Sequence, residues 1–228
     1  MLCRIIYLLT YFFFLIHPGI ATAEIEPAAS LWVKEKQVAL RLISSTNTIG
    51  SSENIKMGIQ FKLKKGWKIY WRSPGDAGFP PSINWKNSKN LKNFLINWPS
   101  PKRFSIQDVN TIGYSDDVVL PILANVKNIN ADLNIRALVD YLVCNKICIP
   151  YKADLKLSLP PGDNSPSPYF QLIDRYQALV PQNIGAHGLT IASATLSETG
   201  SIGKLEIIAN SLKEFINPDL FVEGHPVL

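Results

Sequence analysis

The sequence predicts an all-β protein that contains one β-sandwich, a short helix after it, and part of a second β unit. Three observations lead to this prediction. Short segments in which apolar and polar side chains alternate recur from residue 31 to residue 159, as in strands with one buried face. Helical spacing of apolar residues is found over residues 169–180. Between them, residues 160–168 are rich in proline, glycine and serine, which is typical of a domain boundary.

The first 23 residues have the pattern of a secretory signal peptide. Arg4 is the only charged residue among them, residues 5–16 are almost entirely apolar, and residues 21–23 (Ala-Thr-Ala) have the small-x-small form that signal peptidase cleaves. The apolar run is short for a membrane span, and an uncleaved anchor is the alternative interpretation. We therefore expect residues 1–23 to be removed on export, together with Cys3.

Composition argues against one class of function and sets the size of the fold. Without Arg4, 22 lysine and arginine residues stand against 18 aspartate and glutamate residues, and the basic residues are scattered along the chain. Such a mild and dispersed charge does not support nucleic-acid binding. The roughly 205 residues that follow the signal suffice for one sandwich of ordinary size and part of a second domain.

The predicted sandwich begins with strands over residues 31–43, followed by a polar loop over residues 44–54. Residues 55–63 form the clearest strand, because apolar side chains alternate there with lysine, glycine and glutamine. Lys65 and Gly66 then turn the chain into another strand. On that strand Trp67, Ile69 and Trp71 share one face, whereas Lys68, Tyr70 and Arg72 share the other.

A loop of distinctive composition follows at residues 71–81. Gly75 and Gly78 permit positive φ angles, and three prolines stiffen the chain around them. Such a loop is either the rigid wall of a site or a well-made connection between strands.

Shorter strands complete the predicted sandwich. Residues 83–85, 95–98, 112–114 and 118–126 have strand character, and Pro121 indicates a sheet edge or a bulge. The segment between the second and third of these strands, residues 102–108, is polar around Phe104 and Ile106. An aromatic residue there either closes the end of the sandwich or covers a reactive sulfur.

Cys144 and Cys148 are the two cysteines expected in the mature chain, and they lie four residues apart. In an extended strand their Cα atoms would be about 13 Å apart, whereas a disulfide requires about 7 Å or less. If they bond, the chain must therefore turn at residues 145–147. The odd-numbered residues of 133–143 and of 149–159 are the apolar ones, so both cysteines are expected to point away from the core. A disulfide at the tip of such a hairpin would face solvent, where another protein can reach it.

Two roles fit a cysteine pair of this kind. Exported domains of this size commonly carry one structural disulfide. A short loop, however, gains little stability from the cross-link, and strain makes the bond easier to reduce. The pair is therefore either a structural staple or a redox centre, and the spacing alone does not decide between them.

The residues after the sandwich predict a linker and an incomplete domain. We assign residues 24–160 to the sandwich, 161–180 to the linker and its helix, and 181–228 to the second β unit. Strand patterns recur at residues 189–196 and 205–209, but a complete second sandwich needs more strands than this segment supplies.

Seven short motifs follow one another in a fixed order, at residues 66–72, 74–81, 98–99, 103–104, 112–114, 119–121 and 144–150. Together they resemble the amino-terminal periplasmic domain of the thiol:disulfide interchange protein DsbD. No single motif is specific, but the seven in this order are. The resemblance covers roughly residues 31–159 and is greater for the branch that includes the suppressor of copper sensitivity protein B. The segment after the linker is similar to the second β region of that branch.

The resemblance implies an immunoglobulin-like β-sandwich with a redox-active cysteine pair. The pair would receive electrons from a membrane-embedded thiol-disulfide reductase, as a domain or a separate protein, and pass them to periplasmic thioredoxin-like proteins. Cys144 and Cys148 match the catalytic cysteines, and Cys148 matches the one that forms the mixed disulfide. Phe104 matches the aromatic residue of a cap loop that shields the pair, and Tyr70 and Tyr141 match tyrosines that surround it.

The resemblance further implies a periplasmic protein of a Gram-negative bacterium, with protein-disulfide reductase activity and no cofactor. Two departures from the family pattern are expected to matter. Three residues separate the cysteines here, against five in the best-known members, so the turn between them is expected to differ. The 228 residues include neither the membrane domain nor the terminal thioredoxin-like domain of the full-length family, so they are not expected to bring electrons across a membrane by themselves.

Two other functions stay open. The sandwich is a non-catalytic binding module if the disulfide is structural and the loop at residues 71–81, which begins with Trp71, meets a partner. Two thiolates also suit Cu(I), which would make it a copper-handling module. His187 and His225 lie beyond the linker, and no spacing brings them to the cysteines, so no metal site is predicted. Hydrolase and phosphate-binding functions have no support, because no serine-centred elbow or glycine-rich phosphate loop precedes a helix.

Overall fold

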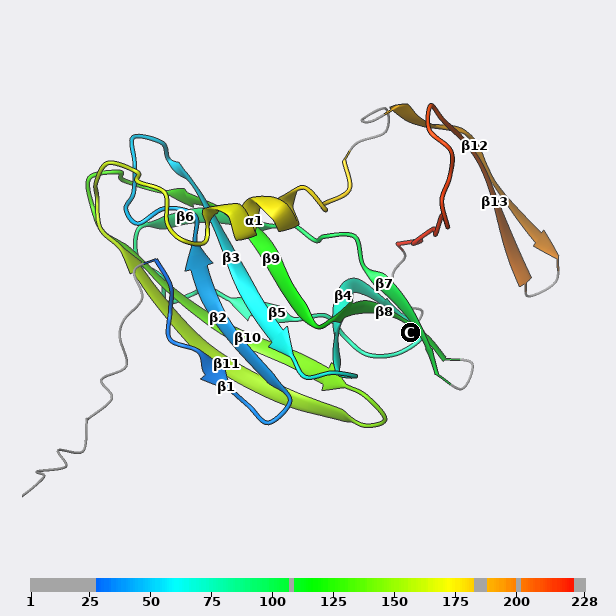
Figure 1. Cartoon of the computed structure of the whole chain (residues 1–228), viewed down its shortest axis with the longest axis horizontal. Coiled ribbons are helices and arrows are strands. Elements are labelled where there is room, and N and C mark those ends of the chain that lie inside the picture. The colour runs from blue at the N-terminus through cyan, green and yellow to red at the C-terminus, as the bar shows by residue number, and fades with distance from the viewer. Residues whose placement is uncertain (1–27, 107–108, 183–187, 200–201, 224–228) are drawn as a thin grey trace, which may run out of the picture.

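The computed structural model describes residues 28–106, 109–182, 188–199 and 202–223 (Figure 1). The predicted signal peptide, residues 1–23, lies outside the described residues. Two antiparallel sheets form a sandwich, and the predicted all-β, immunoglobulin-like fold with a helix after it is confirmed. The first sheet has the strand order β1-β2-β3-β9-β6, which are β1 (Val33–Lys34), β2 (Val38–Ser44), β3 (Asn54–Leu63), β9 (Asp117–Val126) and β6 (Leu91–Ile96).

The second sheet carries the cysteine hairpin. Its order is β11-β10-β4-β8-β7, and a short strand, β5 (Ser82–Asn84), also pairs with β10. The pairing of β10 with β11 runs without a register shift from Leu133 opposite Leu159 to Cys144 opposite Cys148. The members are β11 (Cys148–Leu159), β10 (Leu133–Cys144), β4 (Lys68–Gly75), β8 (Val109–Ser115) and β7 (Lys102–Ile106).

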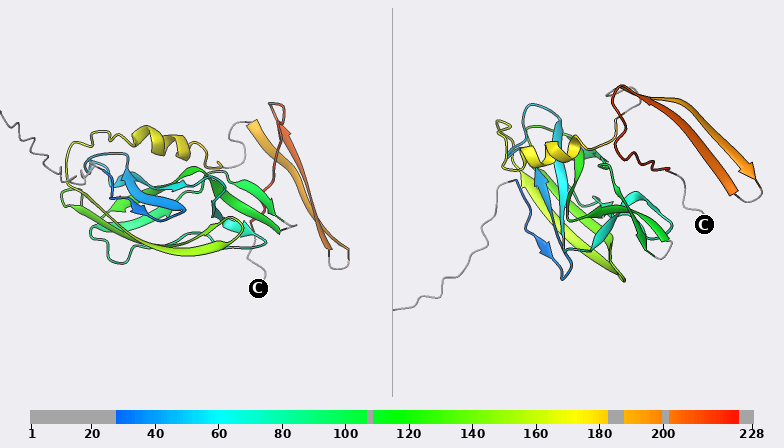
Figure 2. Two further views of the ribbon diagram at one scale, coloured as in Figure 1. Left: turned by 60° about the horizontal axis from the view of Figure 1, so that its bottom comes forward. Right: turned by 45° about the vertical axis from the view of Figure 1, so that its right-hand side comes forward.

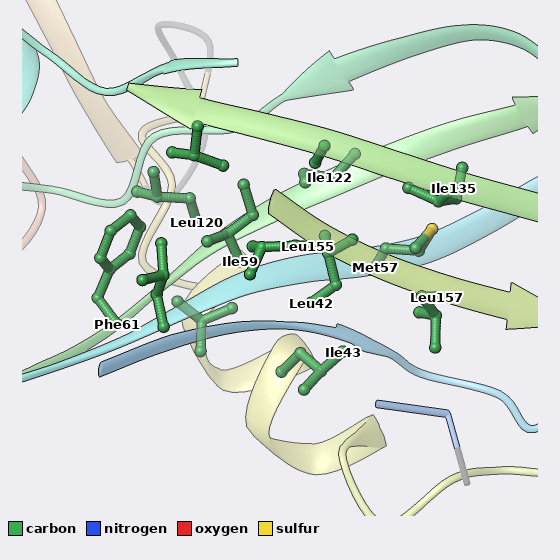
Figure 3. Packing of buried hydrophobic residues seen from close by; sticks show 14 of the residues in the cluster. Leu42, Ile43, Met57, Ile59, Phe61, Leu120, Ile122, Ile135, Leu155 and Leu157 are labelled. Carbon is green, nitrogen blue, oxygen red and sulfur yellow. The ribbon is translucent and has the colours of Figure 1, made fainter. Parts of the chain in front are cut away.

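The core lies between the two sheets, as the alternation predicts. The odd-numbered apolar residues of β10 and β11 point into it and meet the apolar faces of β2, β3 and β9. Phe61 of β3 is fully buried there and makes an edge contact with Tyr141 of β10, with ring centroids 5.7 Å apart. Figure 3 shows part of this core, including Phe61, Leu42, Met57, Ile59, Leu120, Ile122, Ile135, Leu155 and Leu157.

Two local features differ from the sequence prediction. Pro121 marks neither an edge nor a bulge, because β9 lies between β3 and β6 and pairs with β3 without interruption. The proline is tolerated because β6 ends at Ile96, and beyond it the Asn97 amide donates to the Pro121 carbonyl at 2.8 Å. Phe104 lies in a strand and not in a loop, because β7 pairs with β8 as a hairpin.

The helix after the sandwich, α1 (Phe170–Gln177), lies over the first sheet (Figure 2). Its Ile173 is buried, and Asp174 forms an ion pair with Lys56 of β3 at 2.8 Å. The proline-rich segment before it is held by the loop after β2, where the Ile49 amide donates to the Pro160 carbonyl at 2.8 Å. The helix and the residues before it are therefore fixed to the sandwich. The predicted domain limits stay a prediction.

Strands β12 (Leu189–Thr199) and β13 (Ile202–Ser211) form a separate antiparallel hairpin (Figure 1). The chain after β13 returns to the sandwich, where Arg103 of β7 binds the Asp219 carboxylate and the Leu220 carbonyl. The Phe221 ring contacts Trp71, with centroids 5.9 Å apart. Within the described residues, no helix has the length and hydropathy needed to cross a membrane.

Candidate redox site

A disulfide between Cys144 and Cys148 closes the β10–β11 hairpin, with the two Cα atoms 4.1 Å apart. Residues 145–147 form the turn, in which the Asn145 amide donates to the Ile147 carbonyl at 2.9 Å. The turn that the spacing requires is therefore present at these three residues.

The two cysteines differ in exposure. Cys148 is exposed, whereas Cys144 is only 1% exposed. Both point away from the core between the sheets, as their parity predicts, but the expectation that both face solvent is wrong for Cys144. It belongs to a small buried cluster with Tyr70 and Leu142, separate from the main core. Cys144 is buried because a neighbouring strand covers it. Strand β4 pairs with β10 with Lys68 opposite Cys144, and the side chains on the outward face of β4 cover the Cys144 sulfur.

Tyr70 brings its hydroxyl to the disulfide. The hydroxyl donates to Cys144 Sγ at 3.1 Å and lies 3.6 Å from Cys148 Sγ. Burial raises the pKa of Tyr70 above its usual value, so the hydroxyl keeps its proton at neutral pH. A permanent donor therefore faces the sulfur that is hidden from solvent.

The loop after β4 holds Tyr70 in place. Gly78 has a φ of +92°, and a Cβ at this position would lie 2.2 Å from Tyr70 Cζ, so the loop backbone rests on the tyrosine ring. The Asp76 amide donates to the Asn110 carbonyl at 2.9 Å, and the Asn110 amide donates to Asp76 Oδ2 at 2.8 Å. These contacts fix the loop to β8 and favour its interpretation as the wall of a site.

Gly78→Ala is expected to loosen this wall. The substitution places a side chain at positive φ and against the Tyr70 ring, which we expect to cost about 1–2 kcal/mol of unfolding free energy. Because Tyr70 must move, dithiothreitol is expected to reduce the disulfide faster. Urea unfolding and reduction kinetics test both effects. The control is Gly203→Ala, whose Cβ would meet no atom closer than 3.7 Å. Equal behaviour of the two variants would contradict the wall.

Phe104 and Cys144 line the same pocket, which has a volume of about 320 Å³. Phe104 is half-buried, and its ring centroid lies 4.9 Å from Lys68 Nζ. This position is compatible with a shielding residue, and that role stays a prediction. The other lining residues are Gly66, Trp67, Lys68, Ser105, Ser115, Asp116 and Asn145.

Tyr141 lies on the other face of β10 from Cys144. It is 1% exposed and packs in the main core against Phe61 and against Tyr151, whose ring centroid is 5.8 Å away. Burial raises the pKa of its hydroxyl. The structure therefore does not bring Tyr141 to the cysteines, because its odd position in the strand points it inward.

Lys68 is the residue of the site that the sequence analysis missed. It is 6% exposed, stands directly opposite Cys144 across the β4–β10 pairing, and donates from Nζ to Thr111 Oγ1. Burial lowers the pKa of its ammonium group. It forms no ion pair with any described carboxylate. A signal was present, because Lys68 and Tyr70 alternate onto the same face of β4.

The described part of the chain holds no group of three or more histidine, cysteine, aspartate or glutamate side chains suited to a metal ion. His187 and His225, which the copper-handling alternative considers, lie outside the described residues.

A comparison with protein-family models matched residues 39–167 to the family described as thiol:disulfide interchange protein DsbD, N-terminal. The chain belongs to this family. The match covers more than half of the chain and includes Lys68, Tyr70, Phe104 and both cysteines. For this DsbD-family domain, the family expected from the seven motifs is confirmed.

One solved structure supports this assignment. The N-terminal periplasmic domain of ScsB from Proteus mirabilis has 27% sequence identity and a TM-score of 0.64, and the match covers 80% of this chain and 69% of that chain. The predicted suppressor of copper sensitivity branch of the family is thereby confirmed. The DsbD N-terminal domain of Neisseria meningitidis in the reduced form has 10% identity and a TM-score of 0.29, covering 51% and 82%. No curated protein matched the chain.

The geometry of this DsbD-family domain distinguishes the two sulfurs chemically. An incoming thiolate can approach Cys148, which is exposed, whereas Tyr70 and the pocket wall cover Cys144. Attack at Cys148 makes Cys144 the leaving group. Family membership and the bonded pair together make the domain a thiol-disulfide exchange module.

Proposed function

We propose that the domain passes electrons in the periplasm from a membrane-embedded thiol-disulfide reductase to thioredoxin-like proteins, and so acts as a protein-disulfide reductase. The observation that carries the proposal is the unequal exposure of Cys148 and Cys144, which leaves one sulfur open to a partner and keeps the other covered. The similarity to the ScsB domain, which is periplasmic, and the signal peptide predicted over residues 1–23 both support the proposed location.

The exchange runs in balanced steps. The thiolate of the reduced donor attacks Cys148 Sγ, the bond to Cys144 breaks, and its electron pair leaves on Cys144 Sγ. The second thiolate of the donor then attacks the donor sulfur of the mixed disulfide, so that Cys148 leaves as a thiolate and the donor is oxidised. Two electrons have then passed to the pair, and protons from water complete the thiols. In the reverse sense, the Cys148 thiolate attacks an acceptor disulfide and Cys144 resolves the product.

Cys144→Ser is expected to trap the acceptor covalently. The partner used is a periplasmic thioredoxin-like protein whose second cysteine is replaced by serine and whose first cysteine is activated as a mixed disulfide with an aromatic thiol. The Cys148 thiolate attacks the partner's sulfur, the aromatic thiolate leaves, and the new mixed disulfide persists because neither protein holds a second thiol to open it. A band of the summed mass on a non-reducing gel, lost on addition of dithiothreitol, is the measurement. The double variant Cys144→Ser, Cys148→Ser is the matched control and should give no such band. If the single variant also gives none, the proposed exchange with these partners is wrong.

The alternative function, a binding module with an inert disulfide, makes a different prediction about redox potential. Structural disulfides in exported proteins have reduction potentials below about −300 mV, whereas exchange centres lie higher. Equilibration of the domain with glutathione or dithiothreitol buffers gives this value. A potential below that limit would favour the structural staple.

A further inference from the structure

We propose that Lys68 is a positioning residue that stabilises the thiolate of Cys144 when the disulfide is opened, an inference that rests on the proposed exchange function. The consequence is that Cys144, the covered sulfur, becomes the better leaving group, and that a partner is directed to attack Cys148.

The backbone places Lys68 and Cys144 together. They are directly opposite each other in the antiparallel pairing of β4 with β10, so their side chains leave the sheet on the same face with Cβ atoms about 5 Å apart. Both line the pocket that Phe104 also borders. Tyr70, two residues further along β4, shares this face, donates to Cys144 Sγ at 3.1 Å and has Lys68 Nζ 5.8 Å from its ring centroid.

The oxidised site holds a buried amine that lacks an anionic partner among the described residues. Its Nζ donates to Thr111 Oγ1 and lies over the Phe104 ring, and both contacts are weaker compensation than a carboxylate would be. Burial accordingly lowers the pKa of Lys68. Opening the disulfide places a negative charge on Cys144, in the same water-poor surroundings. Each charge alone is costly there, and the two together offset that cost.

The other charged and titratable groups near the pocket do not replace Lys68. Asp116, on the pocket lining, has the opposite sign, but it is exposed and accepts a hydrogen bond from Ser115 Oγ at 3.0 Å. Lys146 in the turn is exposed as well, and solvent screens both charges. Tyr70 contributes a neutral donor. Lys68 is therefore the buried positive charge on the described face of the site.

The test measures the pKa of Cys144 in the Cys148→Ala background, where one thiol remains, from ultraviolet thiolate absorbance against pH. Lys68→Met is expected to raise this pKa by about one unit, which lowers the thiolate fraction at pH 7 about tenfold. Lys68→Arg is expected to restore it. Lys68→Gln is a second neutral variant in case Lys68→Met does not fold. In the two-cysteine protein, Lys68→Met is expected to shift the equilibrium with glutathione toward the disulfide, by about tenfold or about 30 mV at a pH above the Cys144 pKa of both proteins.

A purely structural role for Lys68 predicts the opposite kinetics. If the lysine only anchors Phe104 over the pocket, Lys68→Met loosens the cover and speeds reduction by dithiothreitol. Thiolate stabilisation requires slower reduction, because a leaving thiol of higher pKa leaves more slowly. An unchanged Cys144 pKa, or faster reduction, would overturn the inference. Failure of the proposed function gives a different result. In that case the Cys144 pKa still depends on Lys68, but the domain traps no thioredoxin-like partner.

Discussion

Cys148→Ala is expected to reduce exchange with a periplasmic thioredoxin-like partner to the uncatalysed rate while the domain stays folded. Cys148 is the exposed sulfur and points away from the core, so alanine removes no core contact. The stability lost is that of a cross-link around a very short loop, about 2 kcal/mol in the chain-entropy account. The measurement is the rate at which the reduced domain reduces the oxidised partner, with circular dichroism as the check on folding.

Two further variants sharpen this result. Ser158→Ala, on the same strand and the same exposed face at the far end of β11, is the matched control and should keep the wild-type rate. Cys144→Ala should form the mixed disulfide without turning over, whereas Cys148→Ala should form none. Exchange by Cys148→Ala at the wild-type rate would exclude Cys148 as the attacking sulfur and would remove the basis of the proposed function.

Alternation along single strands predicted the sandwich because each strand buries one face and exposes the other. The β10–β11 hairpin is the clearest case. Its register runs from Leu133 to the cysteines without a bulge, so the alternation of inward and outward side chains is unbroken and the even-numbered cysteines point away from the core. The same parity placed Tyr141 in the core, whereas the family resemblance grouped it with the redox site. The structure agrees with the parity. A match of motif positions does not state which face a side chain occupies.

The burial of Cys144 and of Lys68 could not be predicted in this way. A lysine in an alternating strand normally marks the solvent face. Here that face is covered by residues distant in sequence, because β4 pairs with β10 at one end and the β7–β8 hairpin brings Phe104 over the ammonium group. Which strand lies beside which is a property of the sheet order. Local patterns contain no information about it, so the outer layer of the site required the structure.

Gly113→Ala is expected to cause the largest loss of stability of any glycine substitution near the site, about 3 kcal/mol of unfolding free energy. A Cβ at position 113 would lie 2.0 Å from the Ile69 carbonyl oxygen and 3.1 Å from Tyr70 Cα. Both are backbone atoms of β4, so the strand must move away from β8, with which it pairs at these residues. Urea unfolding gives the free energy, provided that the slope with denaturant stays constant.

The comparison with Gly58→Ala separates a backbone clash from ordinary overpacking. At position 58 the new Cβ would lie 2.5 Å from Val119 Cγ1, a side-chain atom, so a smaller loss is expected because a side chain can shift more easily than a paired strand. Gly113→Ala should also speed reduction of the disulfide, since β4 carries Tyr70, whose side chain covers Cys144, whereas Gly58→Ala in the other sheet should not. If both variants lose equal stability and reduce at the wild-type rate, β4 can move without disturbing the cysteines, and the pairing of β4 with β8 does not hold the site together.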